Sequence, residues 1–353
     1  MAPVPALSVS DLSHSYSGTS PALEGVDLRI ETGELAGLIG PNGSGKSTLL
    51  KALAGALTPS SGRVTLGGCV SGPIPRAGVA YISQEPSLDP EMTVAETFRL
   101  FAILHSLGRS DSRIRIGSLI SSLGLEDVRD RLVARCSGGL RQRLHIALGF
   151  LPDSRLYLFD EPTAALDPEG RQAFWALLSE RVRTGAAALV SLHDLPEAAV
   201  KCDRVLTLYA GRIRAEGSPD VLVAQQGAWV WKARLAREPA DGESVRRAVA
   251  ALPGVRFCRR LPMQVIAVLD GEGPADAVLA ACLEKSGSPA RAYERRRPDL
   301  ESVFHALSIP MDADSPGARG SGGSGGNGGA GKGERRMGGG RLGAQGRAGD
   351  GPD

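Results

Sequence analysis

The nine residues GPNGSGKST, from Gly40 to Thr48, have the residue types and the spacing of a phosphate-binding loop. Glycines allow the backbone to curl until several N–H groups face one point, which forms a nest for an anion. Lys46 can reach the β- and γ-phosphates of a nucleotide, and the hydroxyl of Ser47 can bind Mg²⁺. The candidate nucleotide contacts of this loop are Gly40, Pro41, Asn42, Gly43, Ser44, Gly45, Lys46, Ser47 and Thr48.

A pair of acidic residues, Asp160 and Glu161, follows the apolar run Leu156–Phe159. By itself such a pair is commonly an exposed turn at the end of a strand. In a chain with a phosphate loop, however, the first acid can hold Mg²⁺ through water, and the second can polarise the attacking water as a general base. We therefore expect these roles for Asp160 and Glu161. Together with the loop they predict a P-loop nucleotide hydrolase, a class that many families share.

The elements that position these residues are short apolar runs separated by helical patterns. The strand candidates have apolar residues at consecutive positions, as expected for parallel strands covered on both faces by helices. They are Leu35–Ile39, Val79–Ile82, Leu156–Phe159, Ala187–Leu192 and Val205–Tyr209. The segment from Asp89 to about Arg135 has no strand pattern. We therefore predict an α/β domain over residues 5–228, with a helical subdomain over about residues 89–150.

Two further regions follow this domain. Residues 240–309 predict a small α+β domain: a helix in GESVRRAVAALPG, strands in VRFCRR and QVIAVL, a helix over 275–285, a short strand over 290–294 and a last helix over 300–307. Residues 312–353 are rich in glycine, with scattered arginines and almost no large apolar side chains, so we expect a disordered tail. Its arginines could contact RNA or acidic lipid, although a plain flexible tail is the simpler interpretation.

The composition excludes several other classes of protein. The chain has 353 residues, of which 42% are hydrophobic and 23% charged, and a formal net charge of +2, which gives no electrostatic reason to expect a nucleic acid partner. The five cysteines form no C-x-x-C pair or Cys/His cluster, which argues against a disulfide framework or a zinc site and fits a reducing cytosol. No apolar run approaches the roughly 20 residues of a membrane-spanning helix, and the first residues lack the pattern of a signal peptide. A function at a membrane would therefore need another chain.

The motif that distinguishes among P-loop families is CSGGLRQRL, residues 136–144. Its Ser-Gly-Gly triplet opens a helical pattern shortly before the acidic strand, which resembles the LSGGQ signature of the ATP-binding cassette (ABC) ATPases. Further elements of that family occur in the family's order: an aromatic residue that stacks on adenine, the Q-loop glutamine, the D-loop aspartate and the switch histidine. The corresponding residues are Tyr16, Gln84, Asp167 and His193, and those of the signature are Ser137, Gly138 and Gly139.

The resemblance becomes more specific outside these motifs. The segments PSLDPEMTVAETFRLFAILHSLG, HDLPEAAVKCDRVLTLYAGRIRAEGSP and RRPDLESVFHAL are similar to cassette subunits of the ABC-2-type export class. The similarity covers residues 5 to about 308. It implies a P-loop cassette with a mostly parallel sheet core, an antiparallel β subdomain and a helical subdomain, followed here by the small α+β domain and the tail.

The resemblance also implies how the site works. ATP would lie between two cassettes that close head to tail, so that Ser137 and Gly139 of one chain meet the phosphate loop of the other. The implied catalytic residues are Lys46, Glu161 and His193, and the implied Mg²⁺ ligands are Ser47, Gln84 and Asp160. ATP and Mg²⁺ are the implied cofactors. Integral membrane permease subunits and a second identical cassette are the implied partners, with no nucleic acid and a peripheral location on the inner face of the cell membrane.

The signature departs from the family pattern at two positions. Cys136 replaces the usual Leu or Tyr, and Leu140 replaces the common Gln or Met. Neither change removes a group that touches phosphate, and we interpret Cys136 as a packing residue of its own subunit.

Other cassette classes are alternatives. Translation-type ABC ATPases usually have two cassettes, whereas one phosphate loop is present here, and repair-type members have long coiled-coil insertions that this sequence lacks. A regulatory cassette without hydrolysis is disfavoured because Glu161 and His193 are both present. An importer subunit is disfavoured by the C-terminal resemblance.

Overall fold

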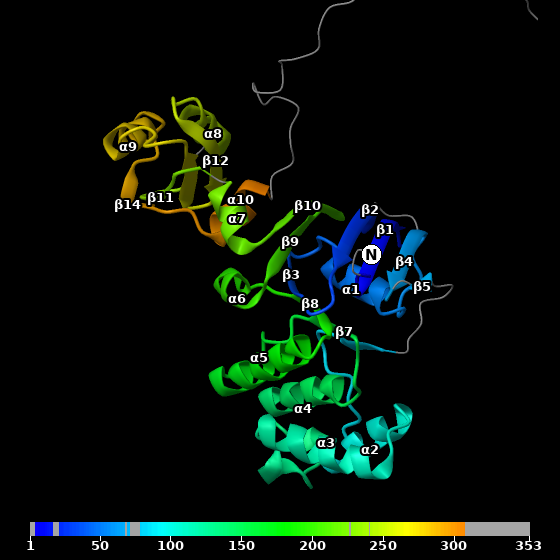
Figure 1. The fold of residues 1–353 in the computed structure, drawn as a ribbon. Helices are drawn as coiled ribbons and strands as arrows, with labels where there is room; N and C mark the ends of the chain where they lie inside the picture. The colour runs from blue at the N-terminus through cyan, green and yellow to red at the C-terminus, as the bar shows by residue number, and fades with distance from the viewer. Residues whose placement is uncertain are drawn as a thin grey trace, which may run out of the picture. The chain divides into compact units, whose positions relative to one another are not determined.

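A six-stranded sheet carries the phosphate loop in the computed structural model (Figure 1). The structure describes residues 4–16, 21–67, 69–70, 78–225, 227–239 and 241–307. The strand order is β10-β9-β3-β8-β7-β6. The strands are β3 (Leu35–Ile39), β6 (Val79–Ile82), β7 (Leu156–Asp160), β8 (Ala187–Ser191), β9 (Arg204–Tyr209) and β10 (Arg212–Gly217). All neighbours are parallel except β10, which is antiparallel to β9. The five strands predicted from apolar runs are thus confirmed, with ends within one residue of the predicted ones.

The strands of a second, antiparallel sheet lie on both sides of the phosphate loop in the sequence. Its order is β2-β1-β4-β5, with β1 (Leu7–His14), β2 (Leu23–Ile30), β4 (Ser61–Leu66) and β5 (Cys69–Val70). The residue pattern predicted none of these strands, and only the family resemblance implied an antiparallel subdomain. Buried and exposed residues alternate along most of β1 and β2, which is typical of strands with one covered face and differs from an apolar run.

The two faces of the central sheet pack against different elements. The helices of this domain are α1 (Lys46–Leu53), α2 (Val94–Leu104), α3 (Arg109–Ser122), α4 (Gly138–Phe150), α5 (Pro168–Arg183), α6 (Leu195–Lys201) and α7 (Pro219–Ala224). On one face, α1 and the antiparallel sheet share a buried apolar cluster with Leu38 and Leu158 of the central sheet. On the other face, the helices α2 to α6 share a cluster with Phe159 and Val190. Every residue of the strands β3, β7 and β8 is therefore buried.

Polar caps determine where the helices next to the site begin. The predicted helical subdomain opens with a capping box, in which Thr93 and Glu96 exchange side-chain and backbone hydrogen bonds at the start of α2. Asp167 caps α5 and Asp194 caps α6, each accepting from a backbone N–H three residues later, with a proline in the first turn. The D-loop aspartate and the residue after His193 thus fix the starts of two helices.

The C-terminal segment, of which residues 240–309 were predicted as a small domain, contains a strand that was not predicted. Its elements are β11 (Trp229–Leu235), α8 (Gly242–Ala250), β12 (Val255–Leu261), β13 (Gln264–Leu269), α9 (Asp276–Lys285) and β14 (Ala290–Arg296). The sheet order β12-β13-β11-β14, with all neighbours antiparallel, is that of a ferredoxin-like fold. The predicted start at residue 240 is therefore too late. Lys232 and Arg234 interrupt the apolar pattern of β11, although this strand pairs on both edges.

The last helix, α10 (Leu300–Leu307), was predicted to complete the small domain, but it also joins the core of the main domain. Leu300 and Val303 belong to the same buried cluster as Ala198 of α6 and Leu222 of α7. Residues up to Ile309 accordingly form one compact unit. The predicted disordered tail, residues 312–353, lies outside the described residues.

The packing of α10 predicts a stability effect from a residue far from the phosphate loop. Leu300 is 3% exposed, so Leu300→Ala should lower the free energy of unfolding by about 2–4 kcal/mol through lost burial and a residual cavity. Val278 on α9 is 48% exposed, and Val278→Ala should change stability by less than about 0.5 kcal/mol. Urea unfolding followed by circular dichroism would measure both. Equal effects of the two variants would mean that α10 does not pack in this core.

Candidate active site

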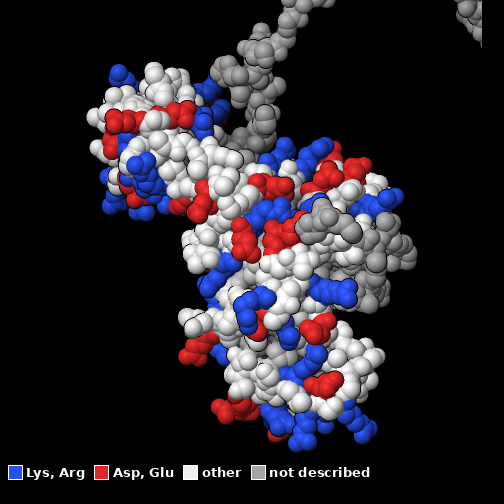
Figure 2. Space-filling model, viewed as in Figure 1, with Lys and Arg blue, Asp and Glu red and all other residues white. Residues whose placement is uncertain are grey.

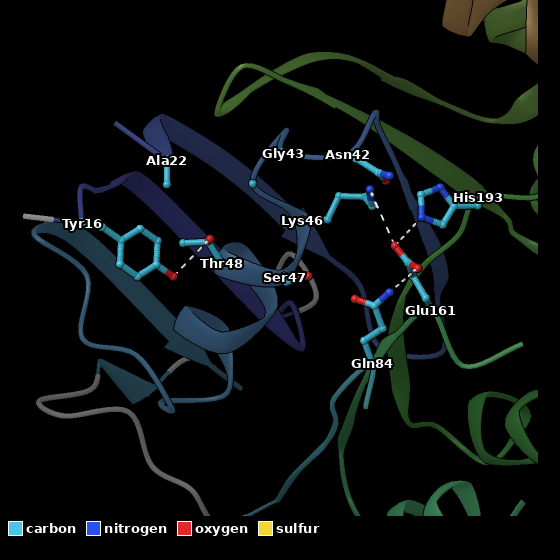
Figure 3. Close-up of a pocket in the computed structure, with 11 residues that line it drawn as sticks. Tyr16, Ala22, Asn42, Gly43, Lys46, Ser47, Thr48, Gln84, Glu161 and His193 are labelled. Carbon is cyan, nitrogen blue, oxygen red and sulfur yellow. Dashed lines mark hydrogen bonds and ion pairs between the residues drawn. The ribbon is translucent and has the colours of Figure 1, made fainter. Parts of the chain in front are cut away.

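One cavity of about 590 Å³ brings together most of the predicted site residues (Figure 3). The predicted residues that line it are Tyr16, Asn42, Gly43, Gly45, Lys46, Ser47, Thr48, Gln84, Glu161 and His193. Ala22 also lines the cavity, and nothing in the sequence indicated this residue. Side chains from widely separated parts of the chain therefore meet around the phosphate loop.

The backbone of the loop depends on glycine at two positions. A Cβ atom at Gly40 would lie 2.3 Å from the carbonyl oxygen of Leu208, and Gly45 has a φ of +105°. Only glycine fits such contacts and such a backbone without strain. The loop leads directly into α1, whose N-terminus adds a partial positive charge to the site. The buried hydroxyl of Ser44 has no hydrogen-bond partner in the part of the chain that the structure describes. Together these features form a cradle suited to an anion.

The ammonium group of Lys46 lies inside this cradle. The residue is 5% exposed, and its Nζ donates to the carbonyl oxygens of Gly40 (2.9 Å) and Pro41 (3.3 Å). Burial lowers the pKa of Lys46, while the nearby carboxylates of Glu161 and Asp160 partly oppose that shift. Backbone carbonyls and nearby carboxylates thus hold the positive charge of Lys46 at the cradle.

The two acids at the end of β7 are held by one serine. Glu161 has a φ of +51°, in the left-handed region that a glutamate rarely adopts. Its backbone N–H donates to the hydroxyl of Ser191 (2.8 Å), which itself donates to the buried carboxylate of Asp160 (2.7 Å). A strained backbone of this kind persists where the surrounding structure fixes it, commonly at functional sites. Ser191 was not among the predicted site residues, although its position at the end of the adjacent strand β8 was a usable signal.

Three side chains point toward the carboxylate of Glu161 (Figure 3). His193 Nε2 lies 2.5 Å from Oε1, Gln84 Nε2 donates to Oε2 at 2.9 Å, and Lys46 Nζ lies 3.9 Å from Oε1. The Glu161 side chain is only 10% exposed, whereas His193 is 47% exposed. The predicted base, the Q-loop glutamine and the switch histidine therefore form one network beside the anion cradle.

Tyr16 lies at the opposite end of the cavity from Glu161 (Figure 3). Its hydroxyl is 3.4 Å from that of Thr48, and its ring packs edge-to-face on His14 with centroids 4.8 Å apart. An aromatic ring at one end and a charged network at the other match the two ends of a nucleotide, base and phosphates.

The signature and D-loop residues do not line this cavity. Ser137 is exposed and caps α4, where its hydroxyl accepts from the backbone N–H of Leu140 (3.3 Å). Gly138 and Gly139 are the first two residues of that helix. Asp167 is likewise exposed at the start of α5. These residues therefore present a helix N-terminus to the surface rather than to the phosphate loop of their own chain.

Two residues of α4 connect the signature helix to the turn after the acids and to the start of α5. Gln142 donates to the carbonyl oxygen of Pro162 (3.1 Å), directly after Glu161. The guanidinium of Arg143 binds both carboxylate oxygens of Asp167, which lowers the pKa of that carboxyl. The sequence analysis did not identify these contacts, because an Arg-Gln-Arg run in a helix carries no signal of its partners.

The unusual signature residues are packing positions, as expected for Cys136. Cys136 is 7% exposed and lies in the apolar cluster beneath α4, and Leu140 packs against the same cluster. Both side chains therefore contact their own subunit.

A buried histidine on the signature helix predicts a pH dependence of stability. Burial lowers the pKa of His145 to about 4. The unfolded chain binds this proton near pH 6.5 and the folded chain does not, so stability is unaffected above that pH and falls below it. From pH 6.5 to 5 the free energy of unfolding should drop by about 2 kcal/mol. Urea unfolding at both pH values would show this drop, and His145→Gln should remove most of it. Burial also lowers the pKa of the exposed His105, but by less, so His105→Gln should remove only a smaller part.

A phosphate loop between a parallel strand and a helix, with acids at the end of a neighbouring strand, defines a P-loop nucleotide hydrolase. Comparison with known proteins narrows this class. The family model described as ABC transporter matches residues 23–164. The chain is 33% identical over 308 residues to the daunorubicin resistance ATP-binding protein DrrA3 of Streptomyces coeruleorubidus, covering 86% of this chain and 96% of that protein. It is 35% identical over 230 residues to the Nod factor export ATP-binding protein I of Rhizobium meliloti, covering 64% and 68%.

Solved structures agree with these relatives. The ATP-binding subunit of an ABC transporter is similar with a TM-score of 0.59 and 34% identity, over 62% of this chain and 92% of that one. A dimeric, post-hydrolysis ATP-binding cassette bound to ADP and phosphate is similar with a TM-score of 0.56 and 25% identity, over 60% and 98%. The chain therefore belongs to the ATP-binding subunits of ABC transporters, and the resemblance to the ABC-2-type export class is confirmed. The family assigns it ATP binding and ATPase activity.

Proposed function

We propose that this chain hydrolyses ATP to drive an ABC exporter, through closure and opening of two cassettes. The observation that carries the proposal is the convergence of Lys46, Gln84 and His193 on Glu161, inside a cavity built on a phosphate loop. Such a constellation joins anion binding to a positioned base, which hydrolysis of a phosphoanhydride requires.

Each side chain has a chemical role in this proposal. The ring of Tyr16 stacks on adenine, which is worth about 1–3 kcal/mol. Lys46 and the loop N–H groups bind the β- and γ-phosphates. Glu161 takes the proton of the attacking water. His193, which contacts the carboxylate of Glu161, would lie near the γ-phosphate.

The donor set also fits Mg²⁺, a hard cation that prefers oxygen ligands and shares them with substrate phosphates. The hydroxyl of Ser47, the amide oxygen of Gln84 and the carboxylate of Asp160 would hold it. Since the Nε2 of Gln84 donates to Glu161, the amide oxygen is the atom left for a cation. Among the described residues, no group of three or more His, Cys, Asp or Glu side chains is arranged to hold a metal. When bound, Mg²⁺ neutralises charge on the β- and γ-phosphates.

The signature residues complete the site in a second copy of the chain. Ser137 and Gly139 lie at the start of α4, outside the cavity of their own subunit. Head-to-tail closure would bring the helix N-terminus and the Ser137 hydroxyl to the γ-phosphate from the opposite side. The dimeric structure of a related cassette supports this arrangement.

The other partners in this proposal are integral membrane permease subunits, which place the chain on the inner face of the cell membrane. In the described part of the chain, no helix has the length and the apolar character needed to span a bilayer. Positive and negative side chains are interspersed on the face shown in Figure 2.

Affinity purification from detergent-solubilised membranes tests this function. Recovery of a partner with several membrane-spanning helices, whose presence increases the ATPase rate, is the expected result. Recovery only with ribosomes or DNA would instead favour a translation-type or repair-type ABC ATPase.

A further inference from the structure

One buried carboxylate outside the cavity connects the two segments that carry the catalytic pair. Glu197 lies in the first turn of α6, with its side chain 7% exposed. Its Oε2 accepts from the hydroxyl of Thr163 (2.9 Å) and its Oε1 from the indole Nε1 of Trp175 (2.7 Å). Arg171 Nε lies 3.6 Å from Oε1 and adds a positive charge. Both oxygens of a buried acid are thus satisfied, as a buried charge requires.

The partners of Glu197 come from both sides of the active site. Thr163 stands two residues after Glu161, in the turn that follows β7. On the other side, Asp194 follows His193 directly and caps α6 by accepting from the backbone N–H of Glu197 (3.1 Å). Arg171 of α5 also lies 3.7 Å from Asp194. Glu197 therefore fixes the start of α6 relative to the turn after Glu161.

The contact between His193 Nε2 and Glu161 Oε1, 2.5 Å, spans the same two segments. Each partner is mobile unless its segment is held: His193 is half-exposed, and Glu161 has a strained backbone. A displacement of either segment by a fraction of an ångström would lengthen this contact. A small misplacement at a reacting centre lowers the rate of chemistry more than it weakens substrate binding.

We propose that Glu197 is a positioning residue for hydrolysis, which holds His193 and Glu161 at the distance that the reaction needs. Glu197 does not line the cavity that Glu161 and His193 share. The proposal rests on the function proposed above, and it predicts an effect on kcat through His193 with little change in KM for ATP.

This role can be tested by removing one hydrogen-bond donor at a time, because Glu197 then keeps its other partners. Thr163→Val and Trp175→Phe each remove one hydrogen bond to Glu197 and keep most of the side-chain volume. Each should lower kcat by about tenfold and leave KM for ATP within about twofold. The matched controls are Thr184→Val and Trp231→Phe. Thr184 is exposed, and Trp231 is a buried tryptophan on β11. Both controls should retain wild-type kcat and KM.

A double-mutant cycle with His193→Ala separates positioning from a general structural effect. If Glu197 acts through His193, Thr163→Val should cause no further loss of single-turnover rate in the His193→Ala background. The same tenfold loss in both backgrounds, or a rise in KM with unchanged kcat, would overturn the proposal. Failure of the proposed function itself would be distinguishable, because Lys46→Ala would then leave ATP turnover unchanged.

Discussion

Glu161→Gln is expected to lower kcat for ATP hydrolysis by at least about 100-fold while nucleotide binding is retained. The amide has nearly the same size as the carboxylate, but it cannot take a proton from water. The phosphate loop and Lys46 do not change, so ATP should still bind. Since hydrolysis is what would separate two closed cassettes, the variant should accumulate as an ATP-bound dimer. Phosphate release and size-exclusion chromatography with ATP would measure the two effects.

The exposed Glu169, in the first turn of α5, provides a matched control. Glu169→Gln makes the same chemical change outside the cavity, so it should retain wild-type turnover and remain monomeric after ATP is consumed. Wild-type turnover in Glu161→Gln would show that another group accepts the proton. Turnover lost together with ATP binding would show that Glu161 holds the loop rather than activating water.

The parts of the fold that could be predicted are short segments in which consecutive residues are apolar and packed in the core. The five parallel strands are apolar at consecutive positions because helices and the second sheet cover both faces, so each run was visible by itself. The strands β1 and β2 expose one face, and β11 contains Lys232 and Arg234, so their residues resemble those of loops. The position of α10 was not predictable, because an amphipathic helix does not encode which of two domains its apolar face contacts.

The candidate site could be predicted where one short segment carries the chemistry. The phosphate loop and the acids were found because each stands at a recognisable spacing or strand end, and Gln84 and His193 were found because their segments resemble those of the family. Residues that hold these groups were missed, among them Ser191, Arg143 and Glu197. Each is an ordinary polar residue whose partner lies between 22 and 34 positions away in the sequence. Only the tertiary structure brings such pairs together.

Two inactive variants are expected to restore ATPase activity when they are mixed. Lys46→Ala removes the phosphate-binding cation, and Ser137→Arg blocks the exposed start of the signature helix, so each homodimer has two defective sites. In a mixed dimer, one site combines an intact loop with an intact signature, while the other carries both defects. Random pairing in a 1:1 mixture would return about a quarter of the wild-type sites.

The double variant Lys46→Ala with Ser137→Arg is the control for this experiment. Mixed with wild type, it forms dimers in which every site has one defect, so it should reduce the turnover of the wild-type chain rather than add to it. If Ser137 served the loop of its own chain, the two single variants would stay inactive in any mixture. The control mixture would then lose no wild-type activity, because each wild-type chain would keep a complete site. Steady-state phosphate release from the mixtures therefore distinguishes a site shared between two chains from a site within one.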